Sequence, residues 1–431
     1  MFRYQPLPAS FFAANRQRFV SHMLPGTAAV FFSNDLLPVN SDEHYRFWQN
    51  SNFYYLSGLD QEKCVLFLFP DAPAPEYREM LFVLKTNEHI QVWEGWKYSI
   101  EEAIYASGIE SVRYVEDWED VLHFMISHIS GFFLDFNEHD RNRLHFPTAA
   151  HRFAERLRNL FPAHTLHRAN PILLNLRSIK SEPEIEQIRR ACQITEQAFR
   201  RVLSFVQPGV CEYEIVHEFI RSGSAGHAYE PIIASGANAC VLHYNQNASI
   251  CHDGDLILFD FGCQYGNYSS DLSRTIPING RFTDRQRQVY DAVLRIHRAC
   301  VQLLVPSDHC IDSYHREVGK IVESELIGLG LLDRTLVQNQ DPARPLYKKY
   351  FMHGTSHHLG LDTHDLGSRF APFQAGMVLT CEPGIYIPEE RIGIRIENDI
   401  LITSNGPVDL MASIPIEAEE IETLMNERAI A

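Results

Sequence analysis

The segment Phe351–Asp365 contains four histidines separated by glycines and other small residues: His353, His357, His358 and His364. It is too irregular for an amphipathic helix and too polar for a buried strand. Neutral imidazole is a common metal ligand and exchanges protons near neutral pH. The segment therefore predicts a site for metal binding or proton transfer. The alternative is a solvated loop in a chain that has 21 histidines.

Two aspartates suggest a partner for this segment. Asp260 lies in an apolar run, residues 255–262, that predicts a strand buried on both faces. A carboxylate there is costly unless it is paired or binds a metal. Asp271 follows eleven residues later, and that length fits a hairpin that brings both carboxylates together. The alternative is two unrelated aspartates at strand ends.

Two further carboxylates belong to strand-like segments. Glu382 ends an apolar run within Gly376–Tyr386, just before a Pro-Gly turn. Residues 392–400 alternate in polarity, which places Arg395 and Glu397 on one face, opposite a face of isoleucines. An exposed amphipathic edge strand explains this alternation equally well.

If the four carboxylates and His357 converge, they repel one another strongly unless cations offset their charge. Two divalent ions ~3.5–4 Å apart form a recognised hydrolytic arrangement. An oxygen-rich ligand set favours a harder ion such as Mn²⁺, with Zn²⁺, Co²⁺ and Fe²⁺ as alternatives. His243, His353 and His364 would then serve in proton transfer and oxyanion contacts.

The elements that must position these residues begin with an α/β pattern in the first third of the chain. Short apolar runs predict buried strands at Ala28–Phe32, Cys64–Phe69, Leu81–Leu84 and Phe132–Phe136. Leu173–Ser178 is predicted to be a connector, and Ser181 with Glu184 forms a capping box that starts a helix. We predict the α/β (α+β) class and two domains, residues 1–170 and 171–431.

The composition narrows the class of protein. Apolar residues make up 45% and charged residues 22% of the 431 residues, as in ordinary globular proteins. A net charge of −17 argues against nucleic-acid binding and weakly against an anionic membrane. Nine scattered cysteines suit reduced thiols, and no apolar run approaches the ~20 residues of a membrane helix. We expect a cytoplasmic protein that binds neither nucleic acid nor membrane.

Five motifs occur in a fixed order. They are Asp-x-Gly at Asp260, Ser-Asp-x-Ser-Arg-Thr at Asp271, His-Gly-x-Ser-His-x-x-Gly-Leu-Asp-x-His-Asp at His357, Glu-Pro-Gly-Ile-Tyr at Glu382 and Gly-Ile-Arg-Ile-Glu at Glu397. With them the chain resembles the creatinase/aminopeptidase, or pita-bread, superfamily, most closely aminopeptidase P, with prolidase next. Residues 46–58 resemble that family's N-terminal domain. The resemblance implies a creatinase-like α/β domain followed by a pita-bread catalytic domain, an antiparallel sheet covered by helices.

The resemblance also implies roles for the candidate ligands. Asp260 resembles the bidentate ligand of one metal ion, Asp271 and Glu397 resemble carboxylates that bridge both ions, and His357 and Glu382 resemble ligands of the other ion. A metal-bridging water or hydroxide would be the nucleophile, and Glu382 would accept its proton.

Other residues resemble parts of the substrate site. His243 resembles the histidine that stabilises charge on the scissile carbonyl oxygen. His353 and His364 resemble the histidines that hold the substrate around the scissile bond. Tyr386 and Arg395 are candidates for orienting the ligands.

Four residues fit less directly. Trp93 and Trp96 are explained by core packing or, alternatively, by an aromatic wall in which Trp93 of a neighbouring subunit covers the peptide beyond the proline. Asn398 stands where relatives often have another acid, which we expect to soften the local charge without removing a ligand. His358 has no assigned role, and we expect it to pack at the surface.

We therefore predict a dinuclear metal-dependent aminopeptidase that cleaves the bond between an N-terminal residue and a following proline, in peptides with proline at the second position. Prolidase, which cuts Xaa-Pro dipeptides, shares every ligand and is the first alternative. A metal-free pita-bread module that binds proteins is the second, although all five candidate ligands are present. We expect a homo-oligomer, either a dimer or a tetramer.

Overall fold

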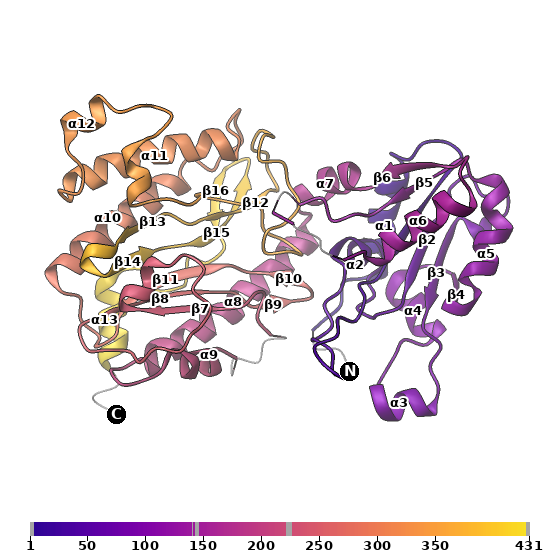
Figure 1. Ribbon diagram of the computed structural model, residues 1–431, viewed down its shortest axis with the longest axis horizontal. Coiled ribbons are helices and arrows are strands. Elements are labelled where there is room, and N and C mark those ends of the chain that lie inside the picture. Colours follow the sequence, from indigo (N-terminus) through magenta and orange to yellow (C-terminus); the bar gives the residue numbers. More distant parts are fainter. Residues whose placement is uncertain (1–3, 140, 143–145, 221–225, 428–431) are drawn as a thin grey trace. The chain divides into compact units, whose positions relative to one another are not determined.

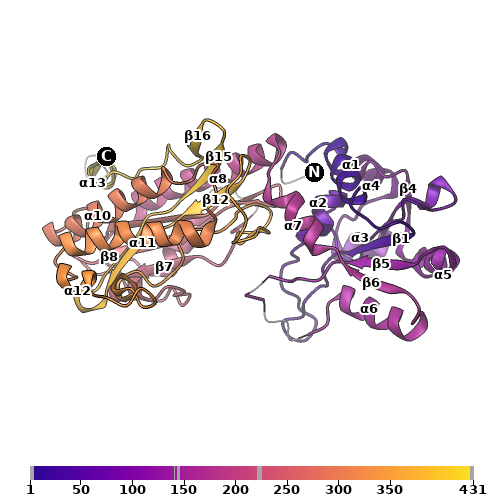
Figure 2. The ribbon, with the colours of Figure 1, turned by 90° about the horizontal axis from the view of Figure 1, so that it is seen from above.

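The computed structural model describes residues 4–139, 141–142, 146–220 and 226–427. The chain divides into two compact units, Met1–Leu176 and Arg177–Ala431, shown in Figure 1 and, from above, in Figure 2. The domain boundary predicted at residue 170 precedes this division. The division falls within the predicted connector Leu173–Ser178, which is part of helix α7 (Asn170–Ser178) and in which Leu173 is fully buried.

The N-terminal unit is built on a six-stranded mixed sheet with the strand order β4-β3-β2-β1-β5-β6 among the described residues. Its strands are β1 (Thr27–Phe32), β2 (Val65–Leu68), β3 (Glu79–Val83), β4 (Ser111–Tyr114), β5 (Gly131–Leu134) and β6 (Thr165–Arg168). Its helices before α7 are α1 (Ala9–Val20), α2 (Ser51–Ser57), α3 (Glu88–Glu94), α4 (Ile100–Ser107), α5 (Trp118–Met125) and α6 (Ala149–Leu160).

Both faces of this sheet are covered at its centre, which explains why β1, β2 and β5 are almost continuously apolar. Val30 of β1 belongs to a core cluster that includes Trp118 of α5 and Phe153 of α6. On the other face, Phe31 contacts Phe19 of α1, with ring centroids 5.2 Å apart. The four apolar runs predicted as buried strands correspond to β1, β2, β3 and β5, so that prediction is confirmed.

The strands of the second unit pair antiparallel wherever their register is described. They are β7 (Ile232–Ser235), β8 (Leu256–Phe261), β9 (Gln264–Tyr265), β10 (Tyr268–Ser269), β11 (Leu272–Pro277), β12 (Val378–Cys381), β13 (Gly384–Ile387), β14 (Ile392–Arg395), β15 (Asn398–Thr403) and β16 (Gly406–Asp409). The strand orders are β11-β8-β7, β12-β15-β16, β13-β14 and β10-β9.

Helices cover these strands. Figure 1 shows α8 and α9 along one side of them and α10 and α11 along the other. The helices are α8 (Glu182–Phe205), α9 (Glu212–Ile220), α10 (Asp284–Val301), α11 (Ile311–Gly328), α12 (Arg334–Gln338) and α13 (Ala418–Asn426). The capping box at the start of α8 is confirmed, since Glu184 accepts hydrogen bonds from the Ser181 backbone N–H at 2.9 Å and hydroxyl at 2.7 Å. Within the described residues, none of the helices combines the length and apolar character needed to cross a bilayer.

Candidate metal centre

The hairpin formed by β8 and β11 brings Asp260 and Asp271 together. Asp260 lies on β8 opposite Ser273 of β11, and Asp271 directly precedes β11. The hydroxyl of Tyr229 lies 2.6 Å from Asp260 Oδ1 and 2.5 Å from Asp271 Oδ1. The predicted hairpin is therefore confirmed, and the alternative of two unrelated aspartates is wrong.

Glu397 joins this hairpin from the junction of β14 and β15. Its backbone N–H donates to the Ser273 carbonyl at 3.0 Å, and its Oε2 accepts a hydrogen bond from the Ser273 hydroxyl at 2.6 Å. The alternating segment is not one strand, because β14 pairs with β13 whereas β15 pairs with β12. Both strands are buried over nearly their whole length, so the alternative of an exposed edge strand is wrong.

The histidine segment runs beside β12 and approaches the hairpin. Glu382 follows β12 directly, and the backbone N–H of Thr380 donates to the His357 carbonyl at 3.0 Å. The Nδ1 of His357 lies 3.0 Å from the His358 carbonyl oxygen, so Nδ1 carries the proton that is donated there. The other nitrogen, Nε2, lies 3.4 Å from Asp271 Oδ2 and 3.8 Å from Glu382 Oε1.

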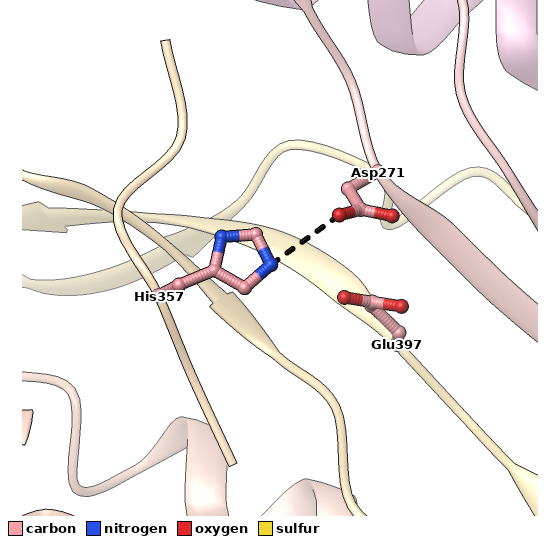
Figure 3. Close-up of side chains that lie close together, drawn as sticks. All are labelled: Asp271, His357 and Glu397. Carbon is pink, nitrogen blue, oxygen red and sulfur yellow. Dashed lines mark ion pairs between the residues drawn. The ribbon is translucent and has the colours of Figure 1, made fainter. Parts of the chain in front are cut away.

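Asp271, His357 and Glu397 form a group that could hold a metal ion, because one ligand atom from each lies within 4.8 Å of the others (Figure 3). Figure 3 shows the imidazole and the two carboxylates, from three separate segments, pointing toward one another. The contacts of Glu382 with His357, and of Asp260 with Tyr229, extend this group into an acidic cluster. We call Asp260, Tyr229 and Arg395 the Asp260 end of this cluster, and we call His357 and Glu382 its His357 end.

The electrostatics of the cluster fit a divalent cation. Burial raises the pKa of Glu382 to about 7. The nearby His357 opposes this increase, and repulsion from Asp271 adds to it. Burial together with Asp271 and Glu382 also raises the pKa of Glu397 well above its usual value. Burial lowers the pKa of His357. The contacts with Asp271 and Glu382 outweigh the effect of burial and raise this pKa to about 9. Protons thus stabilise the cluster where a cation would otherwise do so.

Arg395 supplies a fixed positive charge at the Asp260 end. Its guanidinium donates to Asp260 Oδ2 at 2.6 Å, to the Ser273 hydroxyl at 2.8 Å and to the Tyr386 hydroxyl at 2.9 Å. Burial raises the pKa of Asp260, and the charge of Arg395 opposes this shift without cancelling it. Arg395 and Tyr386, the residues expected to orient ligands, therefore both lie beside the cluster.

Tyr386 links Arg395 to His353. Nδ1 of His353 donates to the Gly354 carbonyl at 2.7 Å, so its Nε2 accepts from the Tyr386 hydroxyl at 2.8 Å. Burial and the nearby Arg395 lower the pKa of His353 to about 3. His353 is therefore a neutral imidazole that also lies 3.7 Å from Glu382, measured from Nδ1 to Oε2.

The remaining predicted histidines lie in different environments. His364 is exposed, and its ring stands edge-on to that of His357 with centroids 4.4 Å apart. His243 is also exposed, next to Tyr244, whose hydroxyl donates to the buried carboxylate of Glu212 at 2.7 Å. The expectation that His358 packs at the surface is wrong, because only 4% of it is exposed.

The tryptophans are exposed in the N-terminal unit. Trp93 lies on α3 and is 76% exposed, and Trp96 is 54% exposed. The core-packing interpretation is therefore wrong for both. The interpretation of Trp93 as a cover for the peptide substrate stays a prediction.

Several residues of the site escaped the sequence analysis. Tyr229 precedes Asp260 and Asp271 by 31 and 42 residues, and no pattern links it to them. Asp399 accepts a hydrogen bond from the Asp271 backbone N–H at 3.1 Å. Asn398, which is expected to soften the local charge, donates to Asp409 at 2.6 Å. For Ser273 the sequence does contain an indication, because residues two apart in a strand lie on the same face and Ser273 follows Asp271 by two.

Two family models match the chain. Metallopeptidase family M24 matches residues 186–404, and the aminopeptidase P N-terminal domain matches residues 12–131. The chain belongs to metallopeptidase family M24. The resemblance inferred from the five motifs is thereby confirmed. Together with the group of Asp271, His357 and Glu397, membership of this family shows that the chain uses a divalent metal.

Named relatives and solved structures agree with this assignment. The chain is 35% identical to Xaa-Pro aminopeptidase of Escherichia coli, over 96% of this chain and 97% of that protein. It is 31% identical to human Xaa-Pro aminopeptidase 3, over 92% of this chain and 80% of that protein. The structure of E. coli aminopeptidase P with the inhibitor Pro-Leu superposes with a TM-score of 0.88 at 32% identity, covering 99% and 100% of the two chains. The predicted fold class is confirmed.

Proposed function

We propose that this member of family M24 is a dinuclear metal-dependent aminopeptidase that hydrolyses the bond between an N-terminal residue and a following proline. The observation that carries the proposal is the convergence of carboxylates and His357 from separate segments of one unit. The relatives named Xaa-Pro aminopeptidase and the structure that holds Pro-Leu support the substrate class.

In this proposal the five predicted ligands would hold two divalent ions, most readily Mn²⁺, with Zn²⁺, Co²⁺ or Fe²⁺ as alternatives. Asp260 would be a ligand of one ion, His357 and Glu382 would be ligands of the other, and Asp271 and Glu397 would be shared by both. The contacts of the two ends with Asp271 support this division, since Tyr229 joins Asp260 to it and His357 lies against it. Such ions, when bound, lower the pKa of water and polarise a carbonyl group.

The chain's own residues then handle protons and orient the peptide. Glu382, whose Oε1 lies 3.8 Å from His357 Nε2, accepts the proton of the attacking water. His243 donates to the scissile carbonyl oxygen as negative charge develops there. Neutral His353 and exposed His364 hold the peptide on either side of the scissile bond. Arg395 and Tyr386 keep Asp260 and His353 in place.

Proline at the second position gives a physical basis for selection. Its bond to the N-terminal residue is a tertiary amide without an N–H, and the ring fixes the backbone angle φ. A site can therefore recognise the ring by shape without losing a hydrogen bond. An open ligand oxygen or metal position among the four carboxylates and two ions would recognise the free amino group of the substrate, which would restrict cleavage to N-terminal residues.

The assembly and location are also proposals. A homo-oligomer, either a dimer or a tetramer, would let Trp93 of a neighbouring subunit cover the peptide beyond the proline, and the exposure of Trp93 supports this. The cysteine pattern supports a cytoplasmic location.

Turnover of matched peptides tests the proposed function. With Mn²⁺ added, Xaa-Pro-Yaa should be cleaved with a kcat/KM about 10–200-fold above that of Xaa-Ala-Yaa, the range that a shape-selecting pocket gives. Acetylating the N-terminus should abolish turnover, and a chelator should remove it reversibly. Equal cleavage of the proline and alanine peptides would refute the proposed specificity. Cleavage restricted to Xaa-Pro dipeptides would favour prolidase, and metal-independent binding without turnover would favour the metal-free module.

A further inference from the structure

A second group of buried charges lies at the end of the histidine segment. Asp365 forms ion pairs with Arg177 and with Lys180, whose Nζ lies 2.9 Å from Asp365 Oδ2. The side chains of these three residues are at most 3% exposed. Burial raises the pKa of Asp365. The charges of Arg177 and Lys180 outweigh the effect of burial and lower this pKa to about 2. Asp365 therefore stays ionised and held from two sides.

Asp365 is connected to the candidate ligand His357 through one carbonyl group. The backbone N–H of Asp365 donates to the His358 carbonyl oxygen at 2.8 Å. The same oxygen accepts the hydrogen bond from His357 Nδ1 at 3.0 Å. The direction of this carbonyl thus fixes which His357 nitrogen is protonated and where Nε2 points. Asp365 also follows His364 directly, and the His364 ring packs edge-on against His357.

Close packing leaves this connection little room to move. A Cβ at Gly360 would lie 2.3 Å from Asp365 Oδ2, and a Cβ at Gly367 would lie 2.1 Å from His358 Cδ2. Both distances are shorter than any ordinary contact, so the segment closes on itself only because these positions are glycines. This arrangement gives His358 a structural explanation, because its buried ring and its doubly accepting carbonyl are parts of one packed turn.

We propose that Asp365, anchored by Arg177 and Lys180, is a positioning residue that orients His357 toward the metal through the His358 carbonyl. This inference rests on the proposed role of His357 as a metal ligand. Asp365 touches neither His357 Nε2 nor the carboxylates of the cluster in the contacts described, so its influence passes through the backbone. Loss of its charge would release the turn and widen the range of His357 orientations, which weakens metal binding.

Mn²⁺ titration calorimetry on the full chain tests this inference. In Asp365→Asn, the Kd for Mn²⁺ should rise about 10–100-fold, the range typical for loss of a residue that orients a metal ligand from outside the ligand set. Asp362→Asn is the matched control, because Asp362 also pairs with Arg177, at 2.8 Å, but its side chain is 42% exposed. The control should change the Kd less than about fivefold. The visible spectrum of the Co²⁺-loaded protein should change in Asp365→Asn and not in Asp362→Asn.

A benchmark variant separates this inference from the proposed function. If His357→Ala binds Mn²⁺ as the wild type does, the proposed ligand set is wrong, whatever Asp365 does. If His357→Ala loses affinity and folded Asp365→Asn does not, only the positioning role is overturned. If Asp365→Asn fails to fold, Lys180→Met tests the positioning role instead, because Asp365 keeps its ion pair with Arg177 in that variant. A rise in Kd with an altered Co²⁺ spectrum supports positioning, and wild-type values of both overturn it.

Discussion

The two ends of the acidic cluster differ in how they balance their charge. At the Asp260 end, Arg395 lies 2.6 Å from the carboxylate, and the Tyr229 hydroxyl contacts the other oxygen. At the His357 end, no arginine contact to Glu382 is described, and its oxygens lie 3.8 Å from His357 and 3.7 Å from His353. One end therefore has a permanent cation, whereas the other depends on exchangeable protons.

This difference has a consequence for metal binding. Arg395 keeps its charge at every accessible pH, so the Asp260 end is organised before a metal arrives. The His357 end is organised by neutral or charged imidazoles and by backbone hydrogen bonds. This contrast fits a rigid Asp260 end and a His357 end that exchanges protons, which the proposed role of Glu382 as proton acceptor requires. Substitutions at the centre and at the Asp260 end test whether the two ends differ in this way.

The largest effect is expected from Asp271, because it contacts both ends. Asp271→Ala should lose metal and activity together, since it removes the carboxylate that His357 and Tyr229 share. Metal analysis of the Mn²⁺-loaded wild type should approach two ions per chain, and the variant should lose both. Asp253→Ala, at an exposed aspartate, is the control. Full activity in Asp271→Ala would refute the site.

The next effect should come from Arg395, and it should depend on metal. In Arg395→Met, the free energy of unfolding of the metal-free chain should fall by about 3–5 kcal/mol, because the largely buried Asp260 loses its cation. Bound Mn²⁺ should recover part of this loss, since it also neutralises Asp260. Denaturant unfolding with and without Mn²⁺ measures both quantities.

An exposed arginine provides the control for this prediction. Arg391 pairs with Asp255 at 3.2 Å, and its side chain is 59% exposed. Arg391→Met should therefore cost less than about 1 kcal/mol. If Arg395→Met costs no more than this control, the Asp260 end does not depend on a permanent cation, and the two ends are more alike than their contacts indicate.

The sequence identifies the candidate ligands that lie together in the fold better than it identifies the residues that support them. Asp260 and Asp271 could be paired because a strand, a turn of fitting length and a second strand are local patterns. Tyr229 could not be predicted, since its contact depends on where β7 and β8 bring the preceding loop. Local patterns determine elements, whereas contacts between distant segments depend on the packed fold.

The wrong prediction for His358 has the same origin. His358 is expected at the surface because the sequence assigns it no role. Its burial follows from the tight turn that Gly360 and Gly367 allow. Packing between residues of this turn, which no local pattern reveals, therefore decides where the ring lies.

The smallest effect is expected from Tyr229, which couples the two ends. Its hydroxyl has one proton and lies between two carboxylate oxygens, 2.6 Å from Asp260 and 2.5 Å from Asp271. It can donate to only one of them at a time, so the three groups share a single hydrogen-bonding system. Tyr229→Phe keeps the ring and removes this link, and it should leave the His357 end unchanged.

Mn²⁺ titration should therefore show one weakened binding step in Tyr229→Phe. The Kd of the ion at the Asp260 end should rise about tenfold, the lower limit for loss of a group that orients a ligand, while the other step keeps its wild-type Kd. Tyr213→Phe, at a half-exposed tyrosine, controls for loss of a hydroxyl elsewhere. Equal weakening of both steps would mean that Tyr229 supports Asp271 rather than the Asp260 end. No change in either would show that the two ends bind metal without its hydroxyl.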